Sequence, residues 1–357
     1  MHLHGKIRIT LHYLLTLALI LPALFFSSCS RVQPTAPQKP PFPIVTTDNL
    51  FAVDCLDRQH TWIVGFNSVI VCTADGGKTW EFQKSGVENN LCAVSFVTPA
   101  VGWISGREGL MLHTTDGGKT WARQKTGVTN HLFTLTFVDE RNGWAAGDFG
   151  TIIHTSDGGT TWVSQGSGED KIYNSIFFAD QNNGWVVGET SLIYHTTDGG
   201  KTWQKQECRE MIPVVDKTQW ETPAPSLYSV WFVDPQHGWA SGMDSTIIAT
   251  EDGGTIWKKL KNPAEERKLT LYKIVAREGN LWAVGQKGTY IHSADSGRTW
   301  ELHADATNTK FWLRDMDFCD GLNGWAVGSR GTIIKTEDGG KTWNMLSGIP
   351  VKHKGNL

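Results

Sequence analysis

The sequence has no strong charge imbalance and few of the residue patterns that are typical of catalysis. Its 357 residues carry a net charge near −3, and no long Lys/Arg run occurs, so charge does not indicate a nucleic-acid partner. The HExxH, GxSxG, P-loop and GxGxxG motifs are all missing, which excludes the usual signatures of zinc peptidases, α/β-hydrolases and nucleotide-binding proteins. The hydrophobic content of 39% is that of a folded, water-soluble body.

Cysteine is sparse and irregularly placed. After Cys29, the remaining cysteines are Cys55, Cys72, Cys92, Cys208 and Cys319. Five is an odd number and the spacings are irregular, so a disulfide framework is not indicated. No CxxC or Cys/His spacing indicates a metal site either. The sequence leaves the disulfide state of these residues open.

The one long apolar run lies near the N-terminus and has the pattern of a targeting segment. Lys6 and Arg8 precede an apolar core at residues 14–26, which is too short to span a bilayer. The small residues before Cys29 resemble the lipobox of bacterial lipoproteins, which implies a signal peptide at residues 1–28 and a diacylated Cys29. Phe26 departs from the Leu that is usual there. An ordinary cleaved signal peptide and an uncleaved anchor are the alternatives.

The residues after Cys29 predict an exported protein held by a tether. Five prolines occur within residues 31–43, a composition typical of a stiff, extended linker, and we assign residues 29–49 to it. Ser30 rather than Asp after the Cys resembles the outer-membrane version of the lipoprotein sorting signal. We therefore expect a lipid-anchored protein on a bacterial membrane, with the outer membrane favoured and the periplasmic side or cell surface left open.

Glycine and tryptophan are abundant, with 38 and 17 residues, because a nine-residue box is repeated seven times. Two copies are identical, HTTDGGKTW at residues 113–121 and 195–203. The boxes recur every 41 to 43 residues except for one interval of 54. Each box ends in a tryptophan: Trp80, Trp121, Trp162, Trp203, Trp257, Trp300 and Trp343. Each also contains one aspartate: Asp75, Asp116, Asp157, Asp198, Asp252, Asp295 and Asp338.

A second motif precedes each box and completes a repeat of four expected strands. It has the form GWAVG, and in the third repeat it follows LFTLTFVD and precedes GTIIHT and TTWVSQ, with glycine-rich turns between them. A period near 40 residues with four strands is typical of a β-propeller. We therefore predict an all-β fold with a single seven-bladed β-propeller of four-stranded antiparallel blades at residues 50–348, followed by a tail at 349–357. A solenoid would need atypical terminal repeats, which the sequence does not have.

The box aspartates are expected to hold turns rather than to perform chemistry. Each box joins the third strand of a repeat to the fourth, where an Asp can accept hydrogen bonds from the turn's own backbone amides and a Gly supplies the positive φ. The Trp is expected to bury its rings at the edge of the blade. A catalytic acid is needed once or as a pair, whereas these seven carboxylates are distributed around a ring.

These motifs resemble the Asp-box (BNR) repeats of sialidases, sortilin-type receptors and xyloglucan hydrolases. The unit NGWAVG…GTIIHT with DGGKTW is more specifically similar to the Ycf48/Hcf136 family, whose members assist assembly of photosystem II and have relatives in non-photosynthetic bacteria. The resemblance covers residues 50–348. It implies a non-catalytic propeller that binds another, membrane-associated protein or acts as an assembly scaffold, and a photosystem II assembly or stability factor if the host is photosynthetic.

An enzymatic or sugar-binding propeller is the alternative. The sequence has no [FY]RIP stretch of the sialidase type and only six tyrosines, and one propeller cannot form the cleft between two propellers that a xyloglucan hydrolase of this type uses. We therefore expect no catalytic residues and no cofactor, while carbohydrate binding remains an alternative. Four histidines in register could suggest a metal, but we expect them on the third strands of different blades, too far apart for one ion. They are His113, His154, His195 and His292.

The turns between second and third strands are the expected partner surface. With the links between blades, they share the face opposite the boxes. They include Arg107, Lys287 and Arg330, and the insertion that causes the 54-residue interval adds Trp220. Photosystem assembly factors present an arginine patch on the propeller, but the second turn position here is basic only at Lys287 and Arg330. The alternative for Trp220 is an ordinary loop residue that packs within its own insertion.

Overall fold

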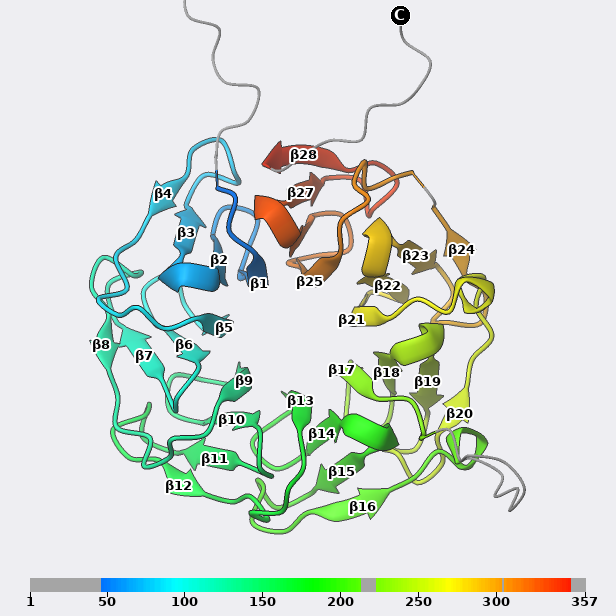
Figure 1. Cartoon of the computed structure of the whole chain (residues 1–357), viewed down its shortest axis with the longest axis horizontal. Helices are drawn as coiled ribbons and strands as arrows, with labels where there is room; N and C mark the ends of the chain where they lie inside the picture. Colours follow the sequence, from blue (N-terminus) through cyan, green and yellow to red (C-terminus); the bar gives the residue numbers. More distant parts are fainter. Residues whose placement is uncertain (1–45, 213–222, 304, 348–357) are drawn as a thin grey trace, which may run out of the picture. The chain divides into compact units, whose positions relative to one another are not determined.

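Seven four-stranded antiparallel sheets surround a central axis in the computed structural model, which describes residues 46–212, 223–303 and 305–347. Figure 1 shows the sheets as the blades of a ring, with the first strand of each blade innermost. This confirms the predicted seven-bladed propeller. The signal segment, Cys29, most of the tether, Trp220 and the C-terminal tail lie outside the described residues. None of the described segments forms a helix that could cross a bilayer.

Each blade uses four strands that are consecutive in the sequence. Blades 1 to 4 are built from β1 (Leu50–Cys55), β2 (Thr61–Gly65), β3 (Ile70–Thr73) and β4 (Glu81–Phe82); β5 (Leu91–Phe96), β6 (Gly102–Gly106), β7 (Met111–Thr114) and β8 (Ala122–Arg123); β9 (Leu132–Phe137), β10 (Gly143–Gly147), β11 (Ile152–Thr155) and β12 (Val163–Ser164); and β13 (Tyr173–Phe178), β14 (Gly184–Gly188), β15 (Ile193–Thr196) and β16 (Gln204–Gln206). The first three of these blades have a fourth strand of two residues, and that strand is exposed.

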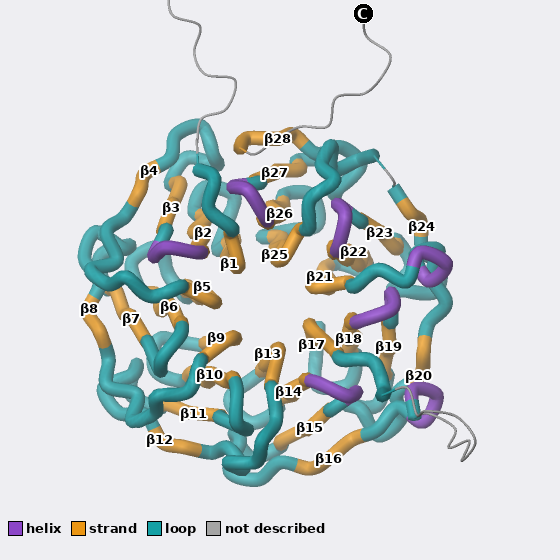
Figure 2. Tube along the Cα trace, viewed as in Figure 1, coloured by secondary structure: helices purple, strands orange, loops and turns teal. Residues whose placement is uncertain are grey.

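Blades 5 to 7 repeat the same order. Their strands are β17 (Leu227–Phe232), β18 (Gly238–Gly242), β19 (Ile247–Thr250) and β20 (Lys258–Lys259); β21 (Leu271–Arg277), β22 (Asn280–Gly285), β23 (Tyr290–Ser293) and β24 (Glu301–Leu302); and β25 (Leu313–Phe318), β26 (Gly324–Gly328), β27 (Ile333–Thr336) and β28 (Asn344–Ser347). Short 3-10 helices occupy several turns, as Figure 2 shows in purple: η2 (Phe66–Ser68), η3 (Glu189–Ser191), η4 (Arg209–Met211), η5 (Met243–Ser245), η6 (Glu265–Arg267), η7 (Gln286–Gly288) and η8 (Ser329–Gly331).

The second strands form the core because both of their faces pack against neighbouring blades. All five residues of β6 are buried, for example, and Trp103 is fully buried. Its indole lies 3.6 Å from the ring of Phe137 in the next blade, centroid to centroid, with an interplanar angle of 5°. Its Nε1–H donates to the carbonyl of Gly158, which belongs to that next blade's box, at 3.1 Å. The GW motif therefore joins one blade to the box of the next.

The same stack recurs at most blade interfaces. Trp–Phe centroid distances of 3.5 to 3.8 Å are found for Trp62 with Phe96, Trp144 with Phe178, Trp185 with Phe232 and Trp282 with Phe318. Two interfaces lack the phenylalanine at the sixth position of the inner strand, where blade 6 has Ala276 and blade 1 has Cys55. The latter is the interface at which the ring closes.

Candidate functional site

The box aspartates are tied into their own turns. In the second box, Asp116 Oδ1 accepts hydrogen bonds from the Thr120 amide at 2.9 Å and from the Thr114 hydroxyl at 2.8 Å, and Asp116 Oδ2 accepts one from the Thr120 hydroxyl at 2.6 Å. The bonds from Thr120 and Thr114 lower the pKa of Asp116 to about 2. Similar bonds lower the pKa of the other box aspartates as well. An ionised carboxylate that is fully used by its turn is poorly suited to proton transfer.

The four histidines before the boxes pack on tryptophans. His113, His154, His195 and His292 stack on the second-strand indoles of their own blades at centroid distances of 4.5 to 5.7 Å. Burial lowers the pKa of each of the four. Within the described part of the chain, no group of three or more His, Cys, Asp or Glu residues is placed to hold a metal ion.

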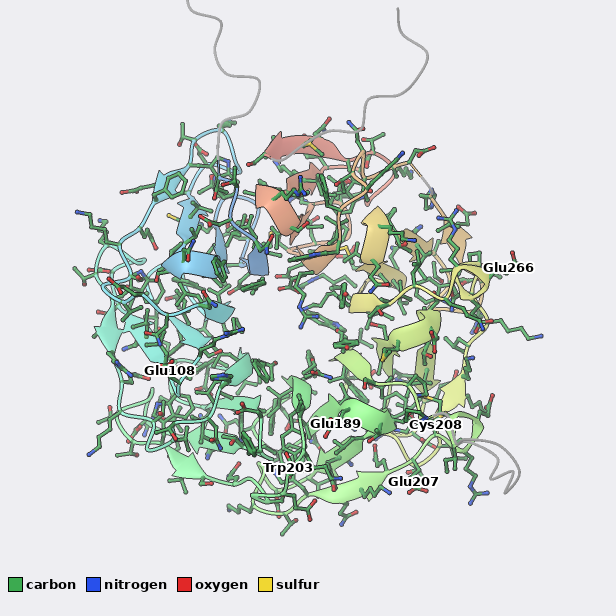
Figure 3. The ribbon with its side chains drawn as sticks, viewed as in Figure 1. Glu108, Glu189, Trp203, Glu207, Cys208 and Glu266 are labelled. Atoms are coloured by element: carbon green, nitrogen blue, oxygen red, sulfur yellow. The ribbon has the colours of Figure 1, made fainter. Side chains whose placement is uncertain are left out.

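The turns between second and third strands place one exposed residue per blade in the left-handed backbone region. These residues have φ between 49° and 60°: Asn67, Glu108, Phe149, Thr190, Asp244, Lys287 and Arg330. Left-handed φ is unfavourable for most of these side chains. We call the surface formed by these seven left-handed turn residues the turn face. Figure 3 shows Glu108 of this face, and Glu189 next to Thr190, between the centre of the ring and its outer rim, with Glu207 and Glu266 near the rim.

The basic residues predicted for partner contact are spread around this face. Arg107 lies in the turn of blade 2, Lys287 in blade 6 and Arg330 in blade 7. The Arg330 guanidinium lies 4.7 Å from the ring of Phe311, just before β25. The structure thus brings Lys287 and Arg330 onto neighbouring blades and places Arg107 two blades away from Arg330, with blade 1 between them. Trp220 lies outside the described residues.

A second, more central ring was not foreseen from the sequence. The second residue of every inner strand is half-buried and lines a cavity of about 340 Å³ at the propeller axis: Phe51, Cys92, Phe133, Asn174, Tyr228, Tyr272 and Arg314. These seven residues are called the channel mouth. Four of them are aromatic, and each inner strand begins on the same side of its sheet as the turn face, because its first residue pairs with the end of the second strand.

Arg314 is the charged centre of the channel mouth. Its guanidinium lies 5.0 Å from the ring of Tyr272 and 5.6 Å from the ring of Tyr228, and the two rings meet edge to face at 5.5 Å. Burial raises the pKa of the Cys92 thiol to about 11, and the charges of Arg107 and Arg314 oppose that rise. The predicted Arg107 and the unforeseen Arg314 therefore act on the same part of the mouth. An arginine packed against aromatic rings, at the end of a rigid strand, is typical of protein recognition sites.

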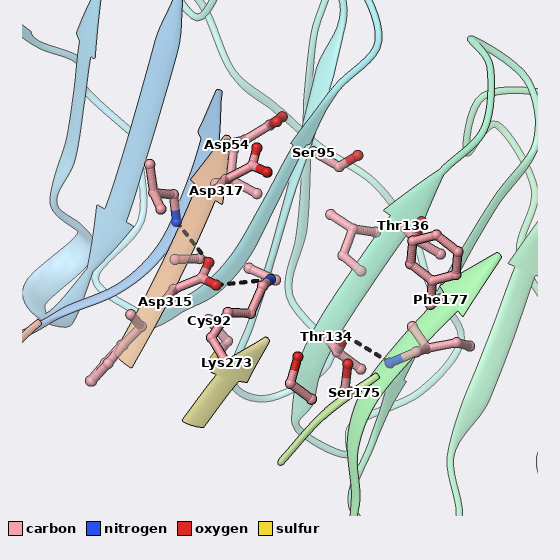
Figure 4. Close-up of a pocket in the computed structure, with 18 of the residues that line it drawn as sticks. Asp54, Cys92, Ser95, Thr134, Thr136, Ser175, Phe177, Lys273, Asp315 and Asp317 are labelled. Carbon is pink, nitrogen blue, oxygen red and sulfur yellow. Dashed lines mark hydrogen bonds and ion pairs between the residues drawn. The ribbon is translucent and has the colours of Figure 1, made fainter. Parts of the chain in front are cut away.

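The cavity beneath the mouth holds a cluster of charged residues on blades 6, 7 and 1. Lys273 Nζ lies 2.8 Å from Asp315 Oδ1, and Figure 4 shows Asp54 and Asp317 beside this pair. Burial and the neighbouring Asp317 raise the pKa of Asp54 well above its usual value. Burial also raises the pKa of Asp317. The pKa of Lys273 is raised as well, because Asp315 outweighs the opposing effect of burial.

These carboxylates cap the free edges of inner strands. Asp315 Oδ2 accepts the Val53 amide at 2.9 Å, and Asp317 Oδ2 accepts the Cys55 amide at 2.8 Å. Asp54 Oδ2 accepts the Phe96 amide in the same way. Neutral side chains play this role elsewhere, where Thr134, Ser175 and Ser229 accept the amides of Ile176, Val230 and Ile274. The acidic cluster is therefore part of the contact between blades, and Asp317 uses both of its oxygens on backbone amides.

The sequence carried a signal for this cluster. The inner strand LRDMDF contains aspartates at its third and fifth positions, where blade 6 has Lys273 at the third, blade 1 has Asp54 at the fifth, and the remaining residues are Ser, Thr or apolar. The pattern does not say whether such residues face a ligand or the next blade, because that depends on the curvature of the ring.

Together, the boxes, the indole stacks and the aromatic channel mouth define an Asp-box β-propeller with one arginine-bearing opening on its turn face. The model of the family described as Photosynthesis system II assembly factor YCF48 matches residues 40–127, 124–218 and 212–304. The chain therefore belongs to this family, which confirms the resemblance expected from the sequence.

One relative and two solved structures are similar to this chain. The Photosystem II assembly protein Ycf48 of Thermosynechococcus vestitus is 35% identical over 66 residues, which are 18% of this chain and 16% of the relative's length. A structure described as YCF48 bound to D1 peptide has a TM-score of 0.68 at 22% identity, covering 82% of this chain and 92% of that one. The GH74 xyloglucanase of Xanthomonas campestris has a TM-score of 0.67 at 12% identity, and the match covers 84% of this chain and 53% of the enzyme. At these identities, the two solved structures show a shared fold.

Proposed function

We propose that this protein is a non-catalytic, exported and lipid-anchored scaffold that binds a segment of another, membrane-associated protein across its channel mouth. The observation that carries the proposal is Arg314, whose guanidinium packs against the contacting rings of Tyr228 and Tyr272 at the axis of a rigid ring. Membership of the assembly-factor family supports an assembly role. The related YCF48 structure with a bound D1 peptide supports a peptide segment as the ligand.

The mouth suits a segment that combines an acidic group with apolar side chains. Arg314 offers a planar cation that can bind a carboxylate in bidentate fashion. Phe51 and Phe133 add half-buried aromatic surface to the same opening. Rigid aromatic anchors next to an arginine commonly supply most of the binding energy at protein interfaces.

Cross-linking in native membranes tests the docking site. The full-length protein is cross-linked in its own membranes and purified, and linked partners are identified by mass spectrometry. Arg314→Ala should sharply reduce the recovered partner. Arg298→Ala is the matched control, because it removes the same charge from the exposed sixth box on the opposite face. Equal recovery with both variants would overturn docking at the mouth.

Anchoring is tested separately through the proposed lipidation site. Cys29→Ala should move the protein from the membrane fraction to the soluble fraction without changing its fold. Tight membrane retention of this variant would refute lipid anchoring. The photosystem II role additionally requires a photosynthetic host. Analysis of the host's pigments tests this requirement directly.

Sugar binding is the second candidate because aromatic rings line the mouth. Rings of this kind can stack on sugars as well as on peptide side chains. A glycan array probed with the full-length protein would favour this candidate if binding occurred and Trp220→Ala or Tyr272→Ala removed it. Binding to no glycan, together with capture of a protein partner, would leave the scaffold proposal in place.

A further inference from the structure

The propeller closes without sharing a strand between its first and last blades. In the described part of the chain, blade 1 contains β1 to β4 and blade 7 contains β25 to β28, each in sequence order. The two blades at the ends of the domain therefore share no β-ladder, and besides side-chain contacts they are joined by a backbone hydrogen bond from the Gly331 amide to the Asp48 carbonyl, just before β1, at 2.8 Å. An interface of this kind opens more easily than one in which a strand from the other end of the chain completes the last sheet.

Packing at this interface differs from that at the others. At five interfaces the second-strand indole stacks on a Phe at the sixth position of the next inner strand. At the closing interface this position is Cys55, which packs in one cluster with Trp325, while Cys319 lies against the same cluster. Cys319 directly follows β25, where other blades have apolar residues such as Val97, Val138 and Val233. Where five other interfaces have a phenylalanine ring, the closing interface therefore has two cysteine thiols.

Two contacts bracket the cysteines. On one side, the Cys55 amide donates to Asp317 Oδ2 at 2.8 Å, and Asp317 is two residues before Cys319. On the other side, Arg58 Nε lies 2.6 Å from Asp320 Oδ2, and Asp320 is the residue after Cys319. Both cysteines are free in the structure, and Cys319 packs against the cluster that contains Cys55. The backbone segments that carry them are therefore held side by side by contacts that do not involve sulfur.

We infer that Cys55 and Cys319 form a disulfide that closes the propeller ring. The bond would link residues 55 and 319 and so enclose nearly the whole domain in one covalent loop. Loops of this length restrict the unfolded chain strongly. The inference rests on the proposed function in one respect, because export of the chain supplies the oxidant: exported proteins meet catalysts that donate disulfides.

The chemistry is a two-step thiol–disulfide exchange. The Cys319 thiolate attacks one sulfur of an oxidant disulfide, RSSR, and releases one RS⁻, which takes up the proton lost from Cys319. The Cys55 thiol then loses its proton and attacks Cys319 in the mixed disulfide, releasing the second RSH. The two protein thiols are oxidised and RSSR is reduced to two RSH, so protons and electrons balance.

The order of attack follows from the environment of each thiol. The neighbouring Cys55 thiol lowers the pKa of Cys319, which favours its thiolate. The neighbouring Cys319 thiol and burial raise the pKa of Cys55. Cys319 is half-buried and Cys55 is buried, so the oxidant reaches Cys319 first.

Thiol mapping of the purified full-length protein tests the inference independently of its location. The protein is treated with oxidised glutathione, remaining thiols are alkylated, and peptides are mapped without reduction. We expect a linked pair containing Cys55 and Cys319 and a fall in Tm of about 4 to 10 °C when the protein is reduced. Alkylation of both cysteines after oxidation, a different linked pair, or an unchanged Tm on reduction would overturn the inference.

The residues at the equivalent positions of other blades suggest substitutions that the fold should tolerate. Cys55→Ala copies Ala276 of blade 6, and Cys319→Val copies Val97 of blade 2. Either change should abolish the effect of reduction on Tm, whereas Cys92→Ser should leave it intact. A redox effect that persists in Cys55→Ala would refute the pairing. If the pair forms in vitro but is absent from protein isolated from cells, the export proposal fails and the pairing itself stands.

Discussion

Replacing Asp315 by alanine should weaken the closing interface more than any comparable change elsewhere in the ring. Asp315 accepts the Val53 amide at 2.9 Å from the neighbouring blade and pairs with Lys273 at 2.8 Å. The exposed fractions of the Asp315 and Lys273 side chains are 12% and 25%. The substitution therefore leaves a largely buried amide without its acceptor and a largely buried ammonium group without its partner.

The expected loss follows from these two contacts. A buried amide left without an acceptor costs about 1 to 3 kcal/mol. Removing one partner of a fully buried ion pair costs about 3 to 5 kcal/mol, but Lys273 reaches water and can recover part of its hydration, so we assign it about 1 kcal/mol. The free energy of unfolding should fall by about 2 to 4 kcal/mol in total. Ser229→Ala is the matched control, because Ser229 accepts the Ile274 amide with a neutral hydroxyl and should lose only the first of these contributions, about 1 to 3 kcal/mol.

Urea unfolding monitored by tryptophan fluorescence measures both variants under the same conditions. Asp315→Asn separates the two contributions, since an amide oxygen can still accept from Val53 while the charge on Lys273 is no longer balanced. A loss for Asp315→Ala no larger than that for Ser229→Ala would refute the reasoning. It would mean that the charged pair contributes nothing beyond a single neutral hydrogen bond.

Further predictions concern charge and the boxes. Burial and Asp317 raise the pKa of Asp54, so its contribution to stability is present below about pH 4 and is lost as pH rises through the folded-state pKa. The Tm of Asp54→Asn relative to wild type should therefore increase between pH 4 and pH 8, and a constant difference would contradict this. Asp157→Ala should lower stability by about 1 to 3 kcal/mol, because the amide and hydroxyl of Thr161 lose their acceptor. Asp252→Ala should cost less in the same urea assay, since Ile256 provides only its amide; an equal loss would show that the hydroxyl bond is not important.

The repeated features of the fold could be predicted from the sequence because they are local. The turn at Asp116 is specified by residues within four positions of it, and the spacing of the boxes gave the number of blades. The contact of Trp103 with Gly158 joins residues 55 positions apart, yet equivalent contacts are made by Trp62, Trp144, Trp185 and Trp282, so it follows from the same pattern once the ring is known.

The candidate site could not be predicted in the same way because it depends on residues that do not repeat. Arg314 meets Tyr228 and Tyr272 only through the curvature of three blades. The turn residues were expected on the correct loops, but the left-handed backbone at Phe149 and Lys287 was not foreseen. The residue pattern of a single strand or turn does not specify which non-repeating side chains from different blades meet at the axis.

Ring closure and partner binding are coupled if the partner docks as proposed. Phe51 of blade 1 stacks on Trp312, next to β25 of blade 7, at a centroid distance of 6.4 Å. A ligand that contacts both Phe51 and Arg314 therefore touches both blades of the closing interface. If blades 1 and 7 separate, this site is split, so the ligand binds only the closed ring and stabilises it by an amount that rises with the logarithm of its free concentration above Kd.

Amide hydrogen exchange measures this coupling directly. The amides of Val53 and Cys55 donate to Asp315 and Asp317 across the closing interface and become exposed when blades 1 and 7 part. The amide of Ile274 donates to Ser229 between blades 5 and 6 and is the internal control. A saturating partner segment should slow exchange at Val53 and Cys55 more than at Ile274. Equal slowing at all three amides would show that the ring opens only by complete unfolding, and it would remove the link between the closing interface and the channel mouth.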